Sequence, residues 1–222
     1  MIETYLERLP LLAILRGVTP DEAVPIGRAL ADAGFAIIEV PLNSPTDPVE
    51  SIRRLADTFG EEYLIGAGTV TDPAMVAVVA QAGGRVIIMP HSDPAVVLAA
   101  KKAELYCVPG VGTATEGFAA LANGASALKV FPAELLGPAV VKAWRSVFPP
   151  DVAFLPVGGI TPENMGPFVA AGAGGFGLGA ALYRPGMSTG DVAVKARTFV
   201  TAWRKLQPAR VPVSSAQGGS PR

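Results

Sequence analysis

Cysteine and histidine each occur only once in the 222-residue chain, as Cys107 and His91. A single cysteine cannot form an internal disulfide, so nothing in the sequence indicates a disulfide-stapled secreted domain. One cysteine and one histidine also cannot build the usual Cys/His zinc cage. Ligand chemistry therefore leaves open only a metal that is bound by oxygen atoms.

The chain also lacks an excess of charge and a long apolar run. It carries 18 Lys+Arg against 19 Asp+Glu, a formal net charge of −1, whereas a general nucleic-acid binder needs a concentrated basic surface. No apolar run approaches the ~18 residues of a membrane span, and residues 1–8 lack the apolar core of a signal peptide. These absences predict a cytoplasmic protein that binds neither nucleic acid nor membranes.

The sequence does contain a regular alternation of short β-branched, apolar runs with longer alanine-rich stretches. Hydrophobic residues make up 50% of the chain, enough for a large core. The runs expected to form strands are Leu11–Leu15, Ala36–Val40, Leu64–Ala67, Val86–Met89, Leu105–Val108, Ala127–Phe131, Ala153–Val157 and Gly175–Leu178. The stretches expected to form helices are Asp21–Ala33, Pro48–Phe59, Pro73–Ala82, Pro94–Lys102, Glu116–Asn123, Pro138–Val147, Pro162–Ala171 and Asp191–Leu206.

Eight strand–helix units with short connections favour a parallel sheet. Eight units in roughly 200 residues favour closure into a (β/α)8 TIM barrel. The main alternative is a doubly wound open sheet, but such sheets usually carry a glycine-rich fingerprint after the first strand, where this chain has Arg16-Gly17-Val18. We therefore predict a single α/β domain over residues 1–207, with a short leading segment and a flexible tail at 208–222.

Three charged residues interrupt or directly follow these apolar strands. Side chains alternate between the faces of a strand. Where Leu128 and Val130 face the helices, Lys129 points into the barrel, and the same pattern places Glu39 and Arg16 inside. All three stand near the carboxyl ends of their strands, where barrel active sites lie. A structural ion pair is the alternative, because charge is buried at a cost unless it is paired.

The chemistry of these three residues predicts a class I aldolase. Burial should lower the pKa of Lys129, and the like charge of Arg16 should lower it further, whereas Glu39 opposes the shift. A neutral amine can attack a carbonyl to form a Schiff base, which then accepts electrons from a breaking C–C bond. Glu39 is suited to move the protons, and Arg16 to hold the carboxylate of an oxo acid.

Glycines that end other strands predict a phosphate site. Gly158 and Gly159 follow the seventh expected strand, while Gly179 and Ala180 follow the eighth and are expected to open a short helix. Loops in these two positions form the recurring phosphate site of such barrels, where backbone N–H groups and a helix dipole attract the anion. Thr69, after the third strand, is a candidate for contacting the carboxylate end of the substrate.

From Leu9 to Leu206 the chain resembles the 2-keto-3-deoxy-6-phosphogluconate / 2-keto-3-deoxy-6-phosphogalactonate aldolase family. The motifs that carry the resemblance are Ala13-Ile14-Leu15-Arg16-Gly17, Ile38-Glu39-Val40-Pro41-Leu42-Asn43-Ser44, Gly66-Ala67-Gly68-Thr69-Val70, Leu128-Lys129-Val130-Phe131-Pro132 and Val157-Gly158-Gly159-Ile160-Thr161.

The resemblance implies a metal-free barrel without cofactors, usually a homotrimer. The implied reaction is reversible cleavage of a phosphorylated keto-deoxy sugar acid to pyruvate and glyceraldehyde 3-phosphate. Lys129 matches the Schiff-base lysine, Glu39 the general acid/base, and Arg16 the active-site arginine of the galactonate branch.

The resemblance also assigns the binding residues. Thr69 matches a residue at the carboxylate end of the substrate, and Gly158, Gly159 and Gly179 match the phosphate cradle. Ala180 stands where relatives often supply a serine hydroxyl to the phosphate, so here only its backbone N–H is left to contribute.

The two branches of the family act on substrates that differ only at C4. Arg16-Gly17, Asn43-Ser44 and the specificity residue Val157 resemble the galactonate type, whereas Ala133-Glu134 resembles the gluconate type. We favour the galactonate substrate, with its C4 epimer as the alternative.

Three other functions remain open at this point. A phosphosugar isomerase on the same barrel would share the phosphate cradle but would not need a covalent Lys129. A metal-dependent class II aldolase would use Glu39 as a ligand and lose activity in chelator. A catalytically silent phosphosugar-binding module would bind without turnover.

Overall fold

The alternation of strands and helices is present in the computed structural model, which describes residues 2–206; the tail predicted at 208–222 lies outside the described residues. The strands are β1 (Leu11–Ile14), β2 (Ile37–Pro41), β3 (Leu64–Gly68), β4 (Val86–Ile88), β5 (Tyr106–Val108), β6 (Gly110–Val111), β7 (Leu128–Val130), β8 (Phe154–Pro156) and β9 (Phe176–Leu178). The helices are α1 (Glu3–Arg8), α2 (Pro20–Ala33), α3 (Pro48–Phe59), α4 (Ala74–Gln81), α5 (Pro94–Lys102), α6 (Ala114–Asn123), α7 (Ala133–Arg145), α8 (Met165–Ala170) and α9 (Thr189–Leu206), with a 3-10 turn η1 (Gly60–Glu62).

All the strand pairs are parallel, but they form two sheets. The larger sheet has the strand order β5-β4-β3-β2-β1-β9, and the smaller has β6-β7-β8. An isolated parallel bridge joins Val157, directly after β8, to Gly177 in β9. The prediction of one sheet of eight strands therefore differs from the observed pairing. The fifth expected strand, Leu105–Val108, corresponds to β5, whereas β6 (Gly110–Val111) was not expected. Pro109 separates the two, because proline has no N–H to continue the ladder.

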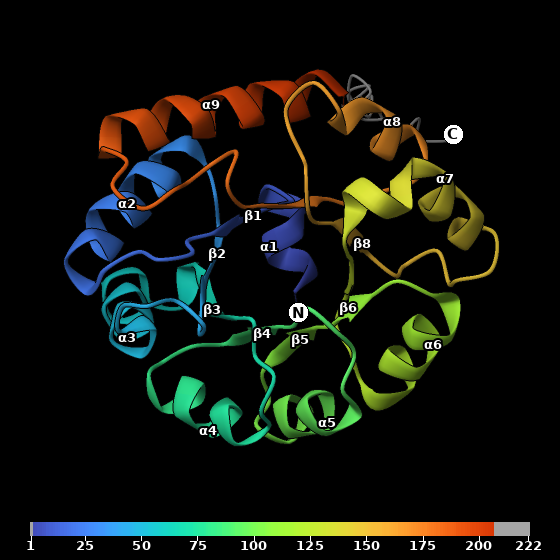
Figure 1. Ribbon diagram of the computed structural model, residues 1–222, viewed down its shortest axis with the longest axis horizontal. Helices are drawn as coiled ribbons and strands as arrows, with labels where there is room; N and C mark the ends of the chain where they lie inside the picture. Colours follow the sequence, from blue (N-terminus) through green and yellow to red (C-terminus); the bar gives the residue numbers. More distant parts are fainter. Residues whose placement is uncertain (1, 207–222) are drawn as a thin grey trace, which may run out of the picture.

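Helices α2 to α9 form an outer ring around the strands, and α1 lies in the middle of the view (Figure 1). Leu128 and Val130 of β7 pack in the large apolar cluster shared with the helices, whereas Lys129 between them does not. The residues that flank Glu39 in β2 follow the same pattern. A second, smaller cluster collects apolar side chains from the opposite face of the strands. The alternation read from the sequence is thus confirmed at both charged positions.

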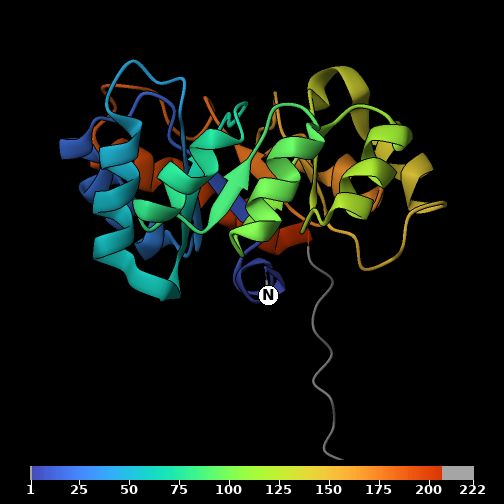
Figure 2. The ribbon, with the colours of Figure 1, turned by 90° about the horizontal axis from the view of Figure 1, so that it is seen from below.

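Helix α1 lies at one end of the ring. It leads into β1 after only two residues, and Tyr5 and Leu6 pack against the smaller apolar cluster. Figure 2 shows α1 on the other side of the strands from the loop that follows β2. Helix α1 therefore covers the amino ends of the strands and leaves their carboxyl ends open. No helix between residues 2 and 206 is long and apolar enough to cross a membrane.

Helix caps fix where the chain turns back toward the sheet. Thr19 caps α2 and Thr113 caps α6, each in a complete capping box. The threonine hydroxyl accepts from the backbone N–H of a glutamate three residues later, and the carboxylate of that glutamate accepts from the backbone N–H of the threonine. Each box satisfies backbone donors that a helix start otherwise leaves unpaired. These short, capped connections hold the loops at the carboxyl ends in place.

Candidate active site

Lys129 and Glu39 line one cavity of about 520 Å³ at the carboxyl ends of the strands. Lys129 projects from β7 and is 7% exposed, and Glu39 projects from β2 and is 2% exposed. The Nζ atom of Lys129 lies 4.7 Å from the centroid of the Phe131 ring, a cation–π distance. The cavity therefore holds an amine and a carboxyl group that the fold has removed from water.

These two buried groups do not neutralise each other by a direct contact. Within residues 2–206, Lys129 and Glu39 form no ion pair within 4.0 Å, and one carboxyl oxygen of Glu39, Oε2, is buried without a hydrogen-bond partner. Buried polar atoms are nearly always satisfied in folded proteins. An unsatisfied oxygen that faces a cavity is therefore available to a ligand or a water molecule.

Burial controls the protonation of both groups. It raises the pKa of Glu39 from 4.5 to about 7, against the opposing influence of Lys129 and Arg16. Burial also lowers the pKa of Lys129, with Glu39 opposing the shift and Arg16 adding to it. The amine is thus moved toward its nucleophilic form, and the carboxyl group can accept or donate a proton near neutral pH.

The carboxyl group of Glu39 has room only because residue 68 is glycine. A Cβ atom at Gly68, at the end of the neighbouring strand β3, would lie 1.8 Å from Oε2 of Glu39. A side chain at position 68 would therefore force the carboxyl group of Glu39 out of its present position. Gly68 was not among the predicted site residues, and its only signal in the sequence was its place in the Gly66-Ala67-Gly68 turn motif.

Arg16 lies at the mouth of the cavity rather than inside it. Strand β1 ends at Ile14, but the alternation continues, because Leu15 packs in the large apolar cluster while Arg16 lines the cavity with an exposed side chain. Its guanidinium group donates to Oδ1 of Asn43 and, over 3.2 Å, to Oγ1 of Thr69. Arg16 nevertheless lines the same cavity as Lys129. Asn43, which the sequence analysis did not select, therefore orients a predicted site residue.

Thr69 adopts a backbone conformation that is rare for its type. Its φ angle is 54°, in the left-handed region that β-branched residues avoid. Strain of this kind tends to be found at functional sites. In this structure Thr69 lines the cavity, and its hydroxyl accepts a hydrogen bond from Arg16.

The predicted phosphate cradle lies along another wall of the same cavity. Gly158 and Gly159 have φ angles of 106° and 64°, which side-chain-bearing residues rarely adopt. Within residues 2–206, the backbone N–H groups of Gly158, Gly159, Gly179 and Ala180 donate no hydrogen bond. Val157 borders these glycines and lines the cavity with 7% exposure. The wall therefore presents several unpaired backbone donors, which suits an anion.

The short helix expected after Gly179 is absent from the described residues. The chain instead makes a turn, in which the N–H groups of Leu182 and Tyr183 bond back to the carbonyl of Gly179 at 2.8 and 3.0 Å. Pro185 and Gly186 follow at once, and neither favours continuing a helix. The expected helix dipole is therefore not available to the anion at this point.

Glu134 is an unexpected neighbour of the cradle. It lines the cavity, and its Oε2 lies 2.7 and 2.8 Å from the positions that Cβ atoms would occupy on Gly158 and Gly159. In the sequence, Glu134 served only as a feature that resembles the gluconate branch of the family. Its place beside an anion site could not be read from the sequence, because it depends on how α7 packs over the loop after β8.

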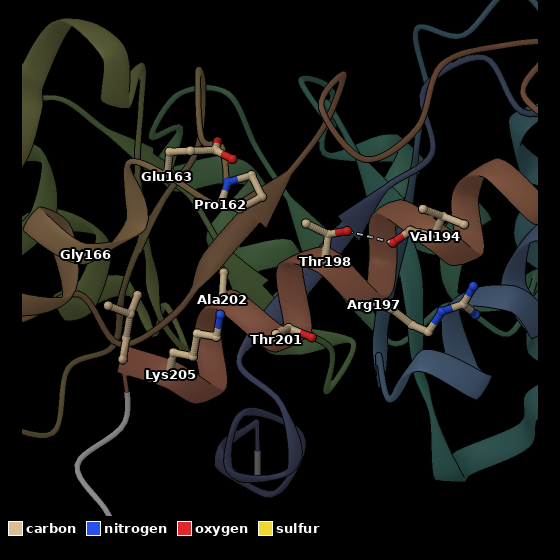
Figure 3. A pocket seen from close by; sticks show the side chains of 10 residues that line it. Pro162, Glu163, Gly166, Val194, Arg197, Thr198, Thr201, Ala202 and Lys205 are labelled. Atoms are coloured by element: carbon tan, nitrogen blue, oxygen red, sulfur yellow. Dashed lines mark hydrogen bonds between the residues drawn. The ribbon is translucent and has the colours of Figure 1, made fainter.

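A larger hollow of about 640 Å³ lies on the outer face of α9 and the segment before α8. Figure 3 shows Thr198 there, with its hydroxyl bonded over 3.0 Å to the carbonyl of Val194 in its own helix. This hollow shares no lining residue with the cavity that holds Lys129. Within residues 2–206, no group of three or more His, Cys, Asp or Glu side chains is arranged to hold a metal ion.

The fold and the cavity together define an enzyme of the parallel α/β class, with a buried amine and a buried carboxyl group at the strand ends. The family model described as KDPG and KHG aldolase matches residues 2–196. The chain belongs to this aldolase family, whose reaction class is that of a carbon–carbon lyase.

Individual relatives refine the comparison. A 2-dehydro-3-deoxy-6-phosphogalactonate aldolase of Escherichia coli is 46% identical over 198 residues, which cover 89% of this chain and 96% of that protein. A 2-dehydro-3-deoxy-phosphogluconate aldolase of Pseudomonas aeruginosa is 32% identical over 170 residues, 76% of each chain. A solved structure described as native KDPGal superposes with a TM-score of 0.87 at 46% identity, covering 90% of this chain and 96% of that one.

Proposed function

We propose that this protein is a class I aldolase that reversibly cleaves 2-keto-3-deoxy-6-phosphogalactonate to pyruvate and glyceraldehyde 3-phosphate. The observation that carries the proposal is the cavity in which Lys129 and Glu39 are both buried and not directly paired. A structural ion pair would place the two charges in contact, whereas a reacting pair must leave room for substrate between them.

The proposed reaction starts with the amine of Lys129. It attacks the C2 carbonyl of the substrate, and loss of water gives a protonated Schiff base. Glu39 takes the proton from the C4 hydroxyl, and the C3–C4 bond breaks. Its electron pair moves to the iminium group, which releases the aldehyde and leaves an enamine. Protonation at C3 and hydrolysis then release pyruvate and free Lys129.

The ends of the substrate fit the two polar walls. Arg16, oriented by Asn43, and Thr69 provide donors for the carboxylate at C1. The unpaired N–H groups of Gly158, Gly159, Gly179 and Ala180 provide donors for the phosphate at C6. This placement spans the cavity with C2 near Lys129 and sets the reacting bond between Lys129 and Glu39.

The galactonate configuration at C4 is supported by the higher identity to the galactonate aldolase, 46% against 32% for the gluconate aldolase. Val157, which lines the cavity after β8, offers an apolar surface where a threonine would offer a hydroxyl. The test compares kcat/KM for the two C4 epimers in the wild type and in Val157→Thr. We expect a wild-type preference for the galactonate epimer that narrows in the variant. A wild-type preference for the gluconate epimer would contradict the assignment.

We also propose that residues 1–207 form one (β/α)8 barrel and that the protein is a homotrimer. Three features support closure of the two sheets into one barrel: the ring of helices, the bridge between Val157 and Gly177, and the fact that Pro109 alone separates β5 from β6. The trimer is implied by the family resemblance. Light scattering coupled to size-exclusion chromatography measures the mass directly, and a monomer or dimer would contradict this part.

The covalent step is tested by trapping. The protein is incubated with pyruvate and sodium borohydride, and its peptides are analysed by mass spectrometry. We expect a reduced pyruvyl adduct on the peptide that contains Lys129 and on no peptide of Lys129→Ala. Lys142, on the outer helix α7, gives the matched control, because Lys142→Ala should trap like the wild type. A folded wild type without an adduct in excess pyruvate would contradict the class I mechanism.

A further inference from the structure

The phosphate wall lacks a positive charge. A phosphate monoester carries about −1.5 to −2 charges at neutral pH, yet the donors from Gly158, Gly159, Gly179 and Ala180 are all neutral backbone groups. The turn after Gly179 provides no helix dipole, and Ala180 provides no hydroxyl. Glu134 adds a negative charge to the same wall. Arg16 borders the Gly179–Ala180 edge but is assigned to the carboxylate end, so a further cation would favour a phosphate dianion on this wall.

A second cavity is lined by such a cation. It has a volume of about 360 Å³ and shares Ile14, Arg16, Gly179 and Ala180 with the cavity that holds Lys129. The two cavities thus meet at the Gly179–Ala180 edge of the cradle. Arg184 lines the second cavity but not the one that holds Lys129.

The turn holds Arg184 in a fixed position but leaves most of its donors free. Its Nε atom donates to the carbonyl of Ala180 over 3.1 Å, and its backbone N–H contacts Sδ of Met187 at 3.3 Å. Within residues 2–206, its two Nη atoms donate no hydrogen bond, and no carboxylate lies within 4.0 Å of it. The side chain of Arg184 is exposed, so these Nη donors are open to solvent and can bind an anion in a bidentate, charge-assisted way.

We propose that Arg184 is the phosphate-binding cation of this site, and that it reaches the anion across the junction of the two cavities at Gly179 and Ala180. The inference rests on the proposed function, since it names a residue for the phosphate end of the same substrate. In this role Arg184 supplies the charge that the absent helix and the absent hydroxyl do not, and it offsets Glu134 on the opposite side of the cradle.

The experiment measures phosphate binding and the covalent step separately. Arg184→Gln, Arg184→Lys and the control Arg197→Gln, an exposed arginine of α9 in the outer hollow, are compared with the wild type. Isothermal titration with inorganic phosphate gives Kd without turnover, and steady-state kinetics gives KM for the phosphorylated substrate. Trapping with pyruvate and borohydride reports on Lys129 with a ligand that has no phosphate.

We expect Arg184→Gln to raise Kd for phosphate and KM by about ten- to a hundredfold, the range for loss of a charge-assisted hydrogen bond. Pyruvate trapping should match the wild type. Arg184→Lys should recover part of the loss, because lysine keeps the charge without the bidentate fork. Arg197→Gln should leave all three readouts unchanged.

Two results would overturn the assignment. One is an unchanged Kd and KM in Arg184→Gln. The other is an equal loss of phosphate binding and pyruvate trapping, which would mean that the residue supports the fold rather than the anion. If phosphate binding depends on Arg184 while the wild type traps no pyruvate, the aldolase mechanism fails and the anion site stands.

Discussion

Two glutamates in this protein experience opposite environments, although the same side chain is involved. Glu50, on the surface of α3, accepts hydrogen bonds from Arg53 at 2.6 and 2.8 Å and from Arg54 at 2.8 Å. These bonds lower its pKa to about 2. Glu39, in the cavity at the strand ends, has one oxygen without any partner, and burial raises its pKa to about 7.

The comparison distinguishes a carboxylate that is already ion-paired from a carboxyl group that has no direct partner and is free to react. Glu50 is locked in its ionised form by arginines that are themselves exposed, so its ion pairs add little to stability in water. Glu39 and Lys129 face each other across a cavity from β2 and β7, where neither can satisfy the other directly. A fold keeps such a pair only by placing it on rigid strands with apolar neighbours on the other face.

The largest effect is expected from removing the amine. Lys129→Ala should reduce turnover of the phosphorylated substrate to the background rate, because no other group in the cavity can form the Schiff base. It should also raise the pKa of Glu39 further, since the charge of Lys129 now lowers it. Steady-state kinetics measures the first effect, and NMR titration of the labelled carboxyl carbon measures the second. Turnover above one hundredth of the wild-type rate would refute the assignment.

Neutralising the unpaired carboxyl group should have the next largest effect. Glu39→Gln keeps the shape of the side chain but removes its proton transfer, a loss that typically costs ~10²–10⁴-fold in rate. In the wild type, kcat/KM should rise with pH through about 7, as Glu39 ionises to become the base. This rise of kcat/KM with pH should be absent in Glu39→Gln. A variant with nearly wild-type kcat would show that the assigned role is wrong.

The same raised pKa predicts a stability change with pH. Folded Glu39 binds its proton more tightly than the unfolded chain does, with a pKa of about 7 against 4.5. Its stabilising contribution is therefore complete below pH 4.5 and is lost as the pH rises toward 7. Relative to Glu39→Gln, the free energy of unfolding should fall by roughly 3 kcal/mol across this window. Urea unfolding of both proteins at several pH values provides the measurement, and parallel curves would contradict it.

The smallest effect is expected at the paired glutamate. Glu50→Gln removes both arginine contacts on α3, yet these groups are exposed to water and salt. We expect an unchanged kcat and only a slight shift in the urea midpoint. A loss of activity comparable to that of Glu39→Gln would mean that the contrast between the two sites does not govern function.

Periodicity predicted most of the fold because it is a local property. The runs around Lys129 and Glu39 are strands in the structure, and their alternation places both charges away from the helices. Helix starts such as Thr19 were readable because capping uses residues three positions apart. The expected fifth strand ended at Val108, as β5 does, but the short strand β6 after Pro109 was missed because its pairing with β7 joins distant parts of the chain.

Predictions were weaker where contacts join distant parts of the chain. Alternation placed Arg16 on the side of the cavity, but it could not show that the side chain is exposed at the mouth, where it contacts Asn43 and Thr69. Asn43 and Glu134 were missed as site residues because their contacts with Arg16 and the cradle glycines come from separate loops. The helix after Gly179 was inferred from a recurring feature of barrels, whereas the local sequence, with Pro185 and Gly186, favours the observed turn.

Gly68 has a consequence for how active members of this family are recognised in sequence data. A chain could retain Lys129, Glu39 and Arg16 and still be inactive, because a single methyl group at position 68 would occupy the space of the Glu39 carboxylate. A survey that scores only charged residues would count such a chain as an enzyme. The hydrogen atom at position 68 is therefore as diagnostic of activity as the functional groups around it.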